Sequence, residues 1–171
     1  MTASIETLYR AATRLSFALM AMGAAVVLVQ TFWISYGVFM RYIMNDPDRY
    51  VTEATALLLV PVAFAGLGYA LMTDAYPKVT LLTERFSRRT QQLIEIINLG
   101  VMIFVGLFFG LSACSATWRS FSSGAASEVL SWPKVYFWAP VALALIGFNL
   151  YAILKLVKLL IAFRGGRPVE A

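Results

Sequence analysis

Histidine is absent from this chain of 171 residues, and Cys114 is its only cysteine. Without an imidazole the chain cannot form a bis-histidine haem site, a histidine-ligated zinc site, or a Ser-His or Cys-His nucleophile pair. One cysteine excludes an intramolecular disulfide and a multi-cysteine metal site. Paired acidic motifs are also missing, so we expect neither an enzyme nor a bound cofactor.

Charge is scarce as well: 13% of the residues are charged and 60% are hydrophobic, with a mean hydropathy of +0.75. A soluble domain has about 25% charged and 45–50% apolar residues. Four runs carry no charge, namely residues 15–40, 54–73, 96–118 and 135–154, of 26, 20, 23 and 20 residues. About 20 helical residues cross a hydrocarbon core of about 30 Å. The sequence therefore predicts an all-α membrane protein, a single domain of four transmembrane helices over these runs.

A cleavable signal peptide is the weaker interpretation of the first run, because the apolar region of such a peptide has only about 7–15 residues. With four spans the two termini share one side, and ten of the fourteen basic residues fall on that side. These ten are Arg10, Arg14, Lys78, Arg85, Arg88, Arg89, Lys155, Lys158, Arg164 and Arg167. The positive-inside rule then predicts cytoplasmic termini. Topology accounts for the net charge of +5, so no nucleic-acid partner is needed.

The second connection, at about residues 78–93, has apolar residues at helical spacing between polar and basic ones. This pattern is typical of an amphipathic helix in the cytoplasmic membrane interface, with its basic residues toward anionic headgroups. Those basic residues are Lys78, Arg85, Arg88 and Arg89. A helix that docks on a partner protein is the alternative interpretation.

Small residues recur four positions apart within two of the spans, at Gly66 and Ala70 and at Gly106 and Gly110. Such strips let two helix backbones approach closely, and they predict an interface either within the chain or with a partner. No Asp, Glu, Lys, Arg or His lies within the four runs, although a solute or ion pathway normally has such a residue at depth.

Residues 41–53 concentrate charge between the first two spans. Asp46 and Pro47 indicate the start of the second helix, which puts Glu53 in one of its first turns. A pair between Glu53 and Arg41 would fasten the first helix to the second, whereas a pair with Arg49 would be local and weak. We expect a structural clamp of Arg41 and Glu53 and leave the choice of arginine open.

Several short motifs together resemble one family, the small membrane (Q-type) subunit of tripartite ATP-independent periplasmic (TRAP) transporters. Arg41 and Tyr42 match the end of that family's first helix, and Glu53 matches the acidic opening of its second. Residues 74–82 are similar to that family's histidine-containing segment and the hydrophobic run that follows it, but they lack the histidine. Residues 130–133 and 138–140 look like a proline-marked entry into the fourth helix.

The resemblance implies a scaffold in a bacterial inner membrane. A separate large membrane subunit would carry a small organic acid by a sodium-driven elevator motion, after a periplasmic solute-binding protein delivers it. The alternative hypothesis is an autonomous four-helix exporter that works as a dimer and couples protons to efflux through a membrane carboxylate.

Overall fold

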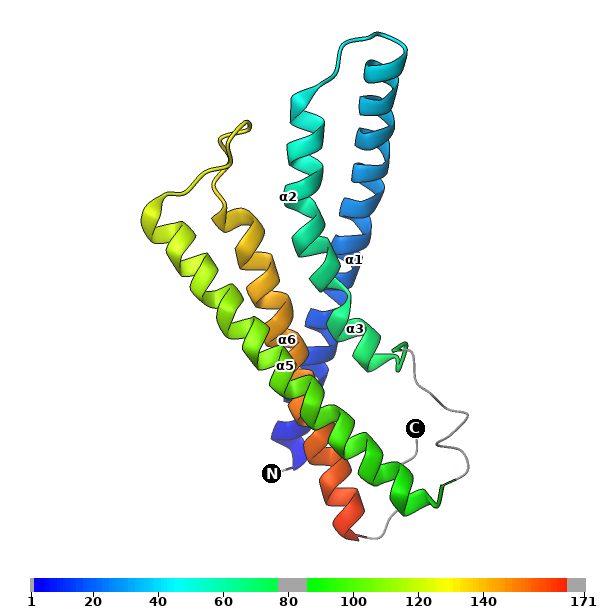
Figure 1. The fold of residues 1–171 in the computed structure, drawn as a ribbon. Helices are drawn as coiled ribbons and strands as arrows, with labels where there is room; N and C mark the ends of the chain where they lie inside the picture. Colours follow the sequence, from blue (N-terminus) through cyan, green and yellow to red (C-terminus); the bar gives the residue numbers. More distant parts are fainter. Residues whose placement is uncertain (1, 77–85, 166–171) are drawn as a thin grey trace.

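A computed structural model describes residues 2–76 and 86–165 of the chain, and helices dominate it (Figure 1). The helices are α1 (Thr2–Tyr42), α2 (Arg49–Ala65), α3 (Leu67–Met72), α5 (Arg88–Ser123) and α6 (Val135–Gly165). No strand occurs within these residues, where a single isolated bridge joins Ala126 to Pro133.

Among the described residues, four helical segments are long and apolar enough to cross a membrane. They are Glu6–Tyr42, Arg49–Met72, Arg89–Ser123 and Val135–Phe163, and the second of them combines α2 with α3. The prediction of an all-α membrane protein with four spans is confirmed. Helices α1 and α5 extend past the uncharged runs at both ends, because charged end turns can lie outside the hydrocarbon core.

The start of α1 and the end of α6 lie at one end of the molecule, which we call the terminal end (Figure 1). The connections at residues 43–48 and 124–134 lie at the other, which we call the loop end. The pair α1 and α2 and the pair α5 and α6 converge around α3 and diverge toward the loop end.

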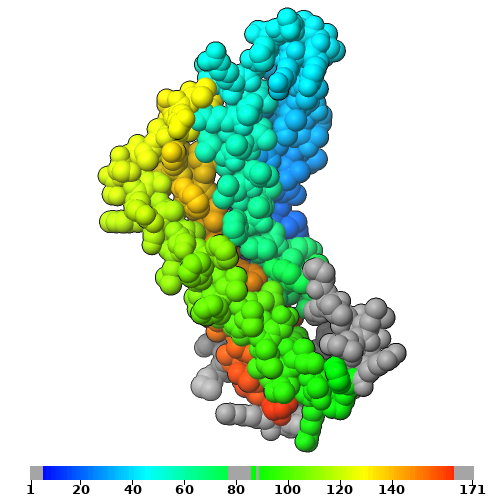
Figure 2. Space-filling view, in the orientation of Figure 1, coloured from blue at the N-terminus to red at the C-terminus, as the bar shows by residue number. Residues whose placement is uncertain are grey.

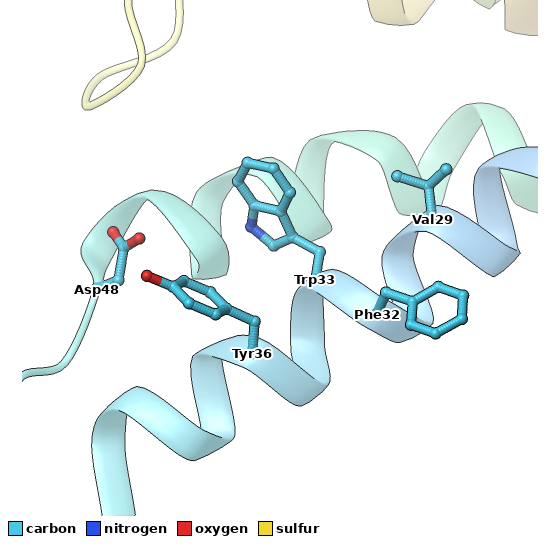
Figure 3. A pocket seen from close by; sticks show the side chains of 5 residues that line it. All are labelled: Val29, Phe32, Trp33, Tyr36 and Asp48. Atoms are coloured by element: carbon cyan, nitrogen blue, oxygen red, sulfur yellow. The ribbon is translucent and has the colours of Figure 1, made fainter. Parts of the chain in front are cut away.

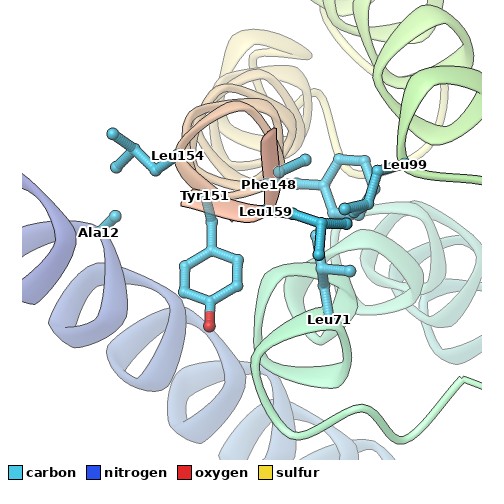
Figure 4. Close-up of a cluster of buried hydrophobic side chains, with 8 residues drawn as sticks. Ala12, Leu71, Leu99, Phe148, Tyr151, Leu154 and Leu159 are labelled. Carbon is cyan, nitrogen blue, oxygen red and sulfur yellow. The ribbon is translucent and has the colours of Figure 1, made fainter. Parts of the chain in front are cut away.

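Helix α6 forms the centre of the bundle. It contacts α1, α2, α3 and α5, and 56% of its apolar window is buried, against 17%, 11% and 17% in the other three spans. In the half near the terminal end, Phe148 and Tyr151 of α6 pack among Ala12, Leu71 and Leu99 (Figure 4). Burial of this apolar surface joins the elements around one helix.

The predicted amphipathic segment lies partly outside the described residues, which stop at 76 and resume at 86. That gap contains Lys78 and Arg85. The remainder of the segment is the beginning of α5, where the Ser87 hydroxyl caps the helix by accepting from the Thr90 N–H at 3.4 Å. Arg88 is the first residue of α5, and Arg89 is exposed on it.

The second span is interrupted at Gly66, five residues after Pro61. Proline has no N–H to donate to the carbonyl one turn earlier, which weakens the helix there. Gly66 has a right-handed φ of −84°, and a Cβ added to it would meet no atom within 4 Å. The close approach occurs two residues later, because a Cβ on buried Gly68 would lie 2.6 Å from Ser16 Oγ.

Alanine substitutions at Gly66 and Gly68 should therefore differ in their effect on the free energy of unfolding. We expect Gly68→Ala to lower the free energy of unfolding by about 1–3 kcal/mol, because it overpacks α1 against α3. Gly66→Ala is the matched control and should leave stability nearly unchanged. Thermal unfolding of the purified chain in detergent measures both, and equal shifts would contradict the assigned contact.

Candidate functional site

The site predicted around Glu53 begins with the start of α2. Asp48, rather than Asp46, is the N-cap: its extended backbone (φ −79°, ψ 116°) lets Oδ1 accept from the Tyr50 N–H at 2.8 Å. An N-cap carboxylate satisfies one of the free N–H groups of the first turn. Helix α2 consequently starts at Arg49, and Glu53 follows one turn later.

The Glu53 carboxylate is held by three consecutive backbone N–H groups of the loop between α5 and α6. Glu128 donates to Oε1 at 2.9 Å, Val129 to Oε1 at 3.1 Å and to Oε2 at 3.0 Å, and Leu130 to Oε2 at 2.6 Å. Successive amides that converge in this way form an anion-binding nest. Hydrogen bonds to an ionised acceptor are among the strong ones in proteins.

The loop presents these amides because it is itself hydrogen-bonded; we call residues 124–134 the hairpin loop. The Ser127 N–H donates to the Trp132 carbonyl at 2.8 Å, and the Trp132 N–H donates to Ser127 Oγ at 3.1 Å. The Lys134 N–H donates to the Ala125 carbonyl at 2.9 Å, and Ser131 takes a left-handed φ of 54°. The loop is thus closed at its base and turned at its tip, and it lies against α2 (Figure 2).

The structure pairs Glu53 with neither Arg41 nor Arg49. The ion pairs among the described residues are those of Lys155, and none involves Glu53 or an arginine. The Arg41 guanidinium instead lies 5.9 Å from the centroid of the Tyr42 ring. Glu53 therefore fastens α2 to the loop that precedes α6, and does not fasten α1 to α2 as predicted.

Contacts within the bundle fasten α1 to α2. Gln30 is buried and donates from Nε2 to the Thr55 carbonyl at 3.2 Å. A Cβ on Gly37 would lie 2.7 Å from Val51 Cγ1, so the two backbones approach closely there. An amide within an apolar run usually makes a hydrogen bond between helices, as Gln30 does here.

The predicted strip on α5 packs against α6 of the same chain. A Cβ on Gly106 would lie 2.7 Å from Asn149 Oδ1 and 2.8 Å from Phe148 Cε1, and one on Gly110 would lie 3.7 Å from Leu145 Cβ. Both glycines are buried. On the other predicted strip Gly66 lies in open space and Ala70 is half-buried, so this strip is not a continuous interface.

A second polar cluster, missed from the sequence, joins the elements at the terminal end. Lys155 Nζ lies 2.7 Å from Asp74 Oδ1 and 3.8 Å from Glu95 Oε1, which links α6 to the end of α3 and to α5. The hydroxyls of Tyr9 and Tyr151 lie 2.5 Å apart, and Lys158 Nζ lies 3.6 Å from the Tyr9 ring centroid. These partners are far apart in the chain, so spacing gives no signal for them.

The two polar clusters thus lie at opposite ends of an apolar bundle that α6 organises. Within residues 2–76 and 86–165 there is no group of three or more Cys, Asp or Glu side chains that could hold a metal ion. The groups described here hold helices and loops in place. This arrangement suits a structural role.

A comparison with protein-family models matches residues 30–162 to "Tripartite ATP-independent periplasmic transporters, DctQ component". Searches of curated proteins and of solved structures found no match. The match covers all of α2, α3 and α5 and nearly all of the described part of α6, together with Glu53 and the hairpin loop. The chain therefore belongs to the DctQ family, the small membrane component of TRAP transporters.

Proposed function

We propose that the chain is the static scaffold of its transporter. It would support a large elevator subunit, driven by a sodium gradient, in the uptake of a small organic acid. A TRAP system also contains a larger membrane subunit and a periplasmic binding protein, and in this proposal the latter delivers the solute.

The proposal rests on the contacts that hold the helices and the hairpin loop of the chain together. Helix α6 contacts every other described helix, the Glu53 carboxylate holds the hairpin loop, and Lys155 joins three elements at the terminal end. A subunit that moved a solute would need an ionisable group facing the bundle interior at depth. The uncharged runs make up most of each of the four spans. Such a bundle is suited to remain fixed while a neighbouring subunit moves.

The proposal also includes an orientation. Both termini would lie on the cytoplasmic side of an inner membrane, since ten of the fourteen basic residues belong to the terminal end or its connection. The segment at about residues 78–93 would lie in that membrane interface, and exposed Arg89 fits contact with anionic headgroups. The hairpin loop and Glu53 would then face the binding protein's compartment.

Co-purification and transport test this function together. A tagged chain should retain the large membrane subunit of its own system through detergent purification. In vesicles, sodium-driven uptake of an organic acid from the binding protein should require the large subunit and this chain together. Full uptake by the large subunit without the chain would overturn the scaffold role.

The same vesicles test the alternative hypothesis that the chain is an exporter. The chain alone should show no proton-coupled efflux of a fluorescent organic cation, because both oxygens of its boundary carboxylate are engaged by backbone amides. Efflux by the lone chain that disappears in Glu53→Gln would establish the exporter and refute the scaffold.

A further inference from the structure

An apolar groove near the loop end is formed by one face of α1 and the N-cap of α2. It is lined by Val29, Phe32, Trp33, Tyr36 and Asp48 and is an open hollow of about 440 Å³ (Figure 3). The Tyr36 hydroxyl points toward the Asp48 carboxylate, and the Trp33 ring lies beside them along the helix (Figure 3). The groove therefore has an aromatic wall with a negative charge at one end.

The side chains of the wall are exposed. Phe32 is 76% exposed, Val29 60%, Tyr36 53% and Trp33 44%. Asp48 Oδ1 accepts from the Tyr50 N–H, but no ion pair among the described residues neutralises the carboxylate. Arg41 and Arg49 are not among the residues that line the groove. The site thus combines an uncompensated carboxylate with open aromatic faces.

The aromatic rings and the carboxylate of the groove favour the binding of a cation. Trp and Tyr rings attract an ammonium group at their faces, and a carboxylate adds a charge-assisted hydrogen bond. An anionic headgroup would instead be repelled by Asp48. Tryptophan and tyrosine also prefer the headgroup depth of a bilayer. Val29 and Phe32 lie up to two turns nearer the start of α1, which is deeper in the bilayer, and they would contact acyl chains there.

We propose that this groove binds a phospholipid with an ethanolamine headgroup, with its ammonium at Asp48, Tyr36 and Trp33. This site is independent of the transport function proposed above, because it needs only the chain and a bilayer. Its occupancy is read from bound lipid without a transport assay.

The test uses the full chain in nanodiscs that contain equal amounts of phosphatidylethanolamine and phosphatidylglycerol. Native mass spectrometry after gentle release counts the lipids that remain bound. We expect phosphatidylethanolamine to be retained in excess, and Asp48→Asn to lower that excess about fivefold. Asparagine caps a helix as well as aspartate does, so this variant removes the charge and keeps the start of α2.

Two further variants separate the site from a general effect of aromatic residues. Trp33→Leu should lower the excess, whereas Trp118→Leu, which changes a 70% exposed tryptophan on α5, should not. An equal retention of both lipids by the unaltered chain, or an unchanged excess in Asp48→Asn, would overturn the proposal. It would also be overturned if the complex with the large subunit carried no such lipid, because the groove would then be a protein interface.

Discussion

Replacing Gly106 with leucine is expected to lower the free energy of unfolding by about 1–3 kcal/mol or more, because the added side chain overpacks α5 against α6. A Cβ alone would lie 2.8 Å from Phe148 Cε1, and Phe148 belongs to the buried core cluster and has little room to move. The larger side chain should force the two helices apart. Denaturant unfolding in detergent, followed by the recovery of complex with the large subunit, measures the effect.

Gly100→Leu is the matched control, since it makes the same change on the same helix. A Cβ on Gly100 would meet no atom within 4 Å, so we expect unfolding close to that of the unaltered chain. Comparable losses in the two variants would mean that leucine harms α5 wherever it is placed. The loss of stability in Gly106→Leu would then not be due to the close contact of Gly106 with α6.

Replacing Glu53 with alanine is expected to release the hairpin loop from α2. The N–H groups of Glu128, Val129 and Leu130 would lose their acceptor and become open to water. Hydrogen–deuterium exchange at these amides should accelerate about tenfold or more. Solute uptake by the assembled transporter should fall in parallel, because the loop end would no longer be fixed.

Two companion changes sharpen this prediction. Glu53→Gln should accelerate exchange less than alanine, since its amide oxygen still accepts while its side-chain nitrogen would place a donor against amides that are donors themselves. Glu128→Gln alters an exposed carboxylate next to the nest and keeps the backbone N–H that Glu53 uses, so exchange there should not change. If Glu53→Ala left the exchange of residues 128–130 unchanged, the hydrogen bonds would not fasten the loop.

The predicted clamp paired Glu53 with an arginine, whereas in the structure its partners are backbone amides. Glu53 was singled out because a carboxylate at the edge of an apolar run is unusual, and the structure does place it in a polar contact. The prediction paired it with an arginine because only side-chain charges are visible in a sequence. Its actual partners are backbone amides about 75 residues further along the chain, and every residue except proline carries such an N–H.

The glycine strips also show which contacts the sequence could not predict. The pair Gly106 and Gly110 forms a close helix contact, while Gly66 lies in open space and Gly68 makes the contact instead. Spacing alone cannot distinguish these, because the rotation of a helix about its own axis decides which face meets a neighbour. In the second span that rotation is altered by the interruption at Gly66.

The sequence by itself determined the class of this protein, namely an all-α membrane protein with four spans, because the cost of placing charge in hydrocarbon makes spans readable from charge spacing alone. It also pointed to the TRAP small subunit through residues near the ends of those spans. Only the tertiary structure decided that α6 is the central helix, that Glu53 binds the hairpin loop and that Lys155 joins Asp74 and Glu95. These contacts depend on how distant helices cross, which no local pattern encodes.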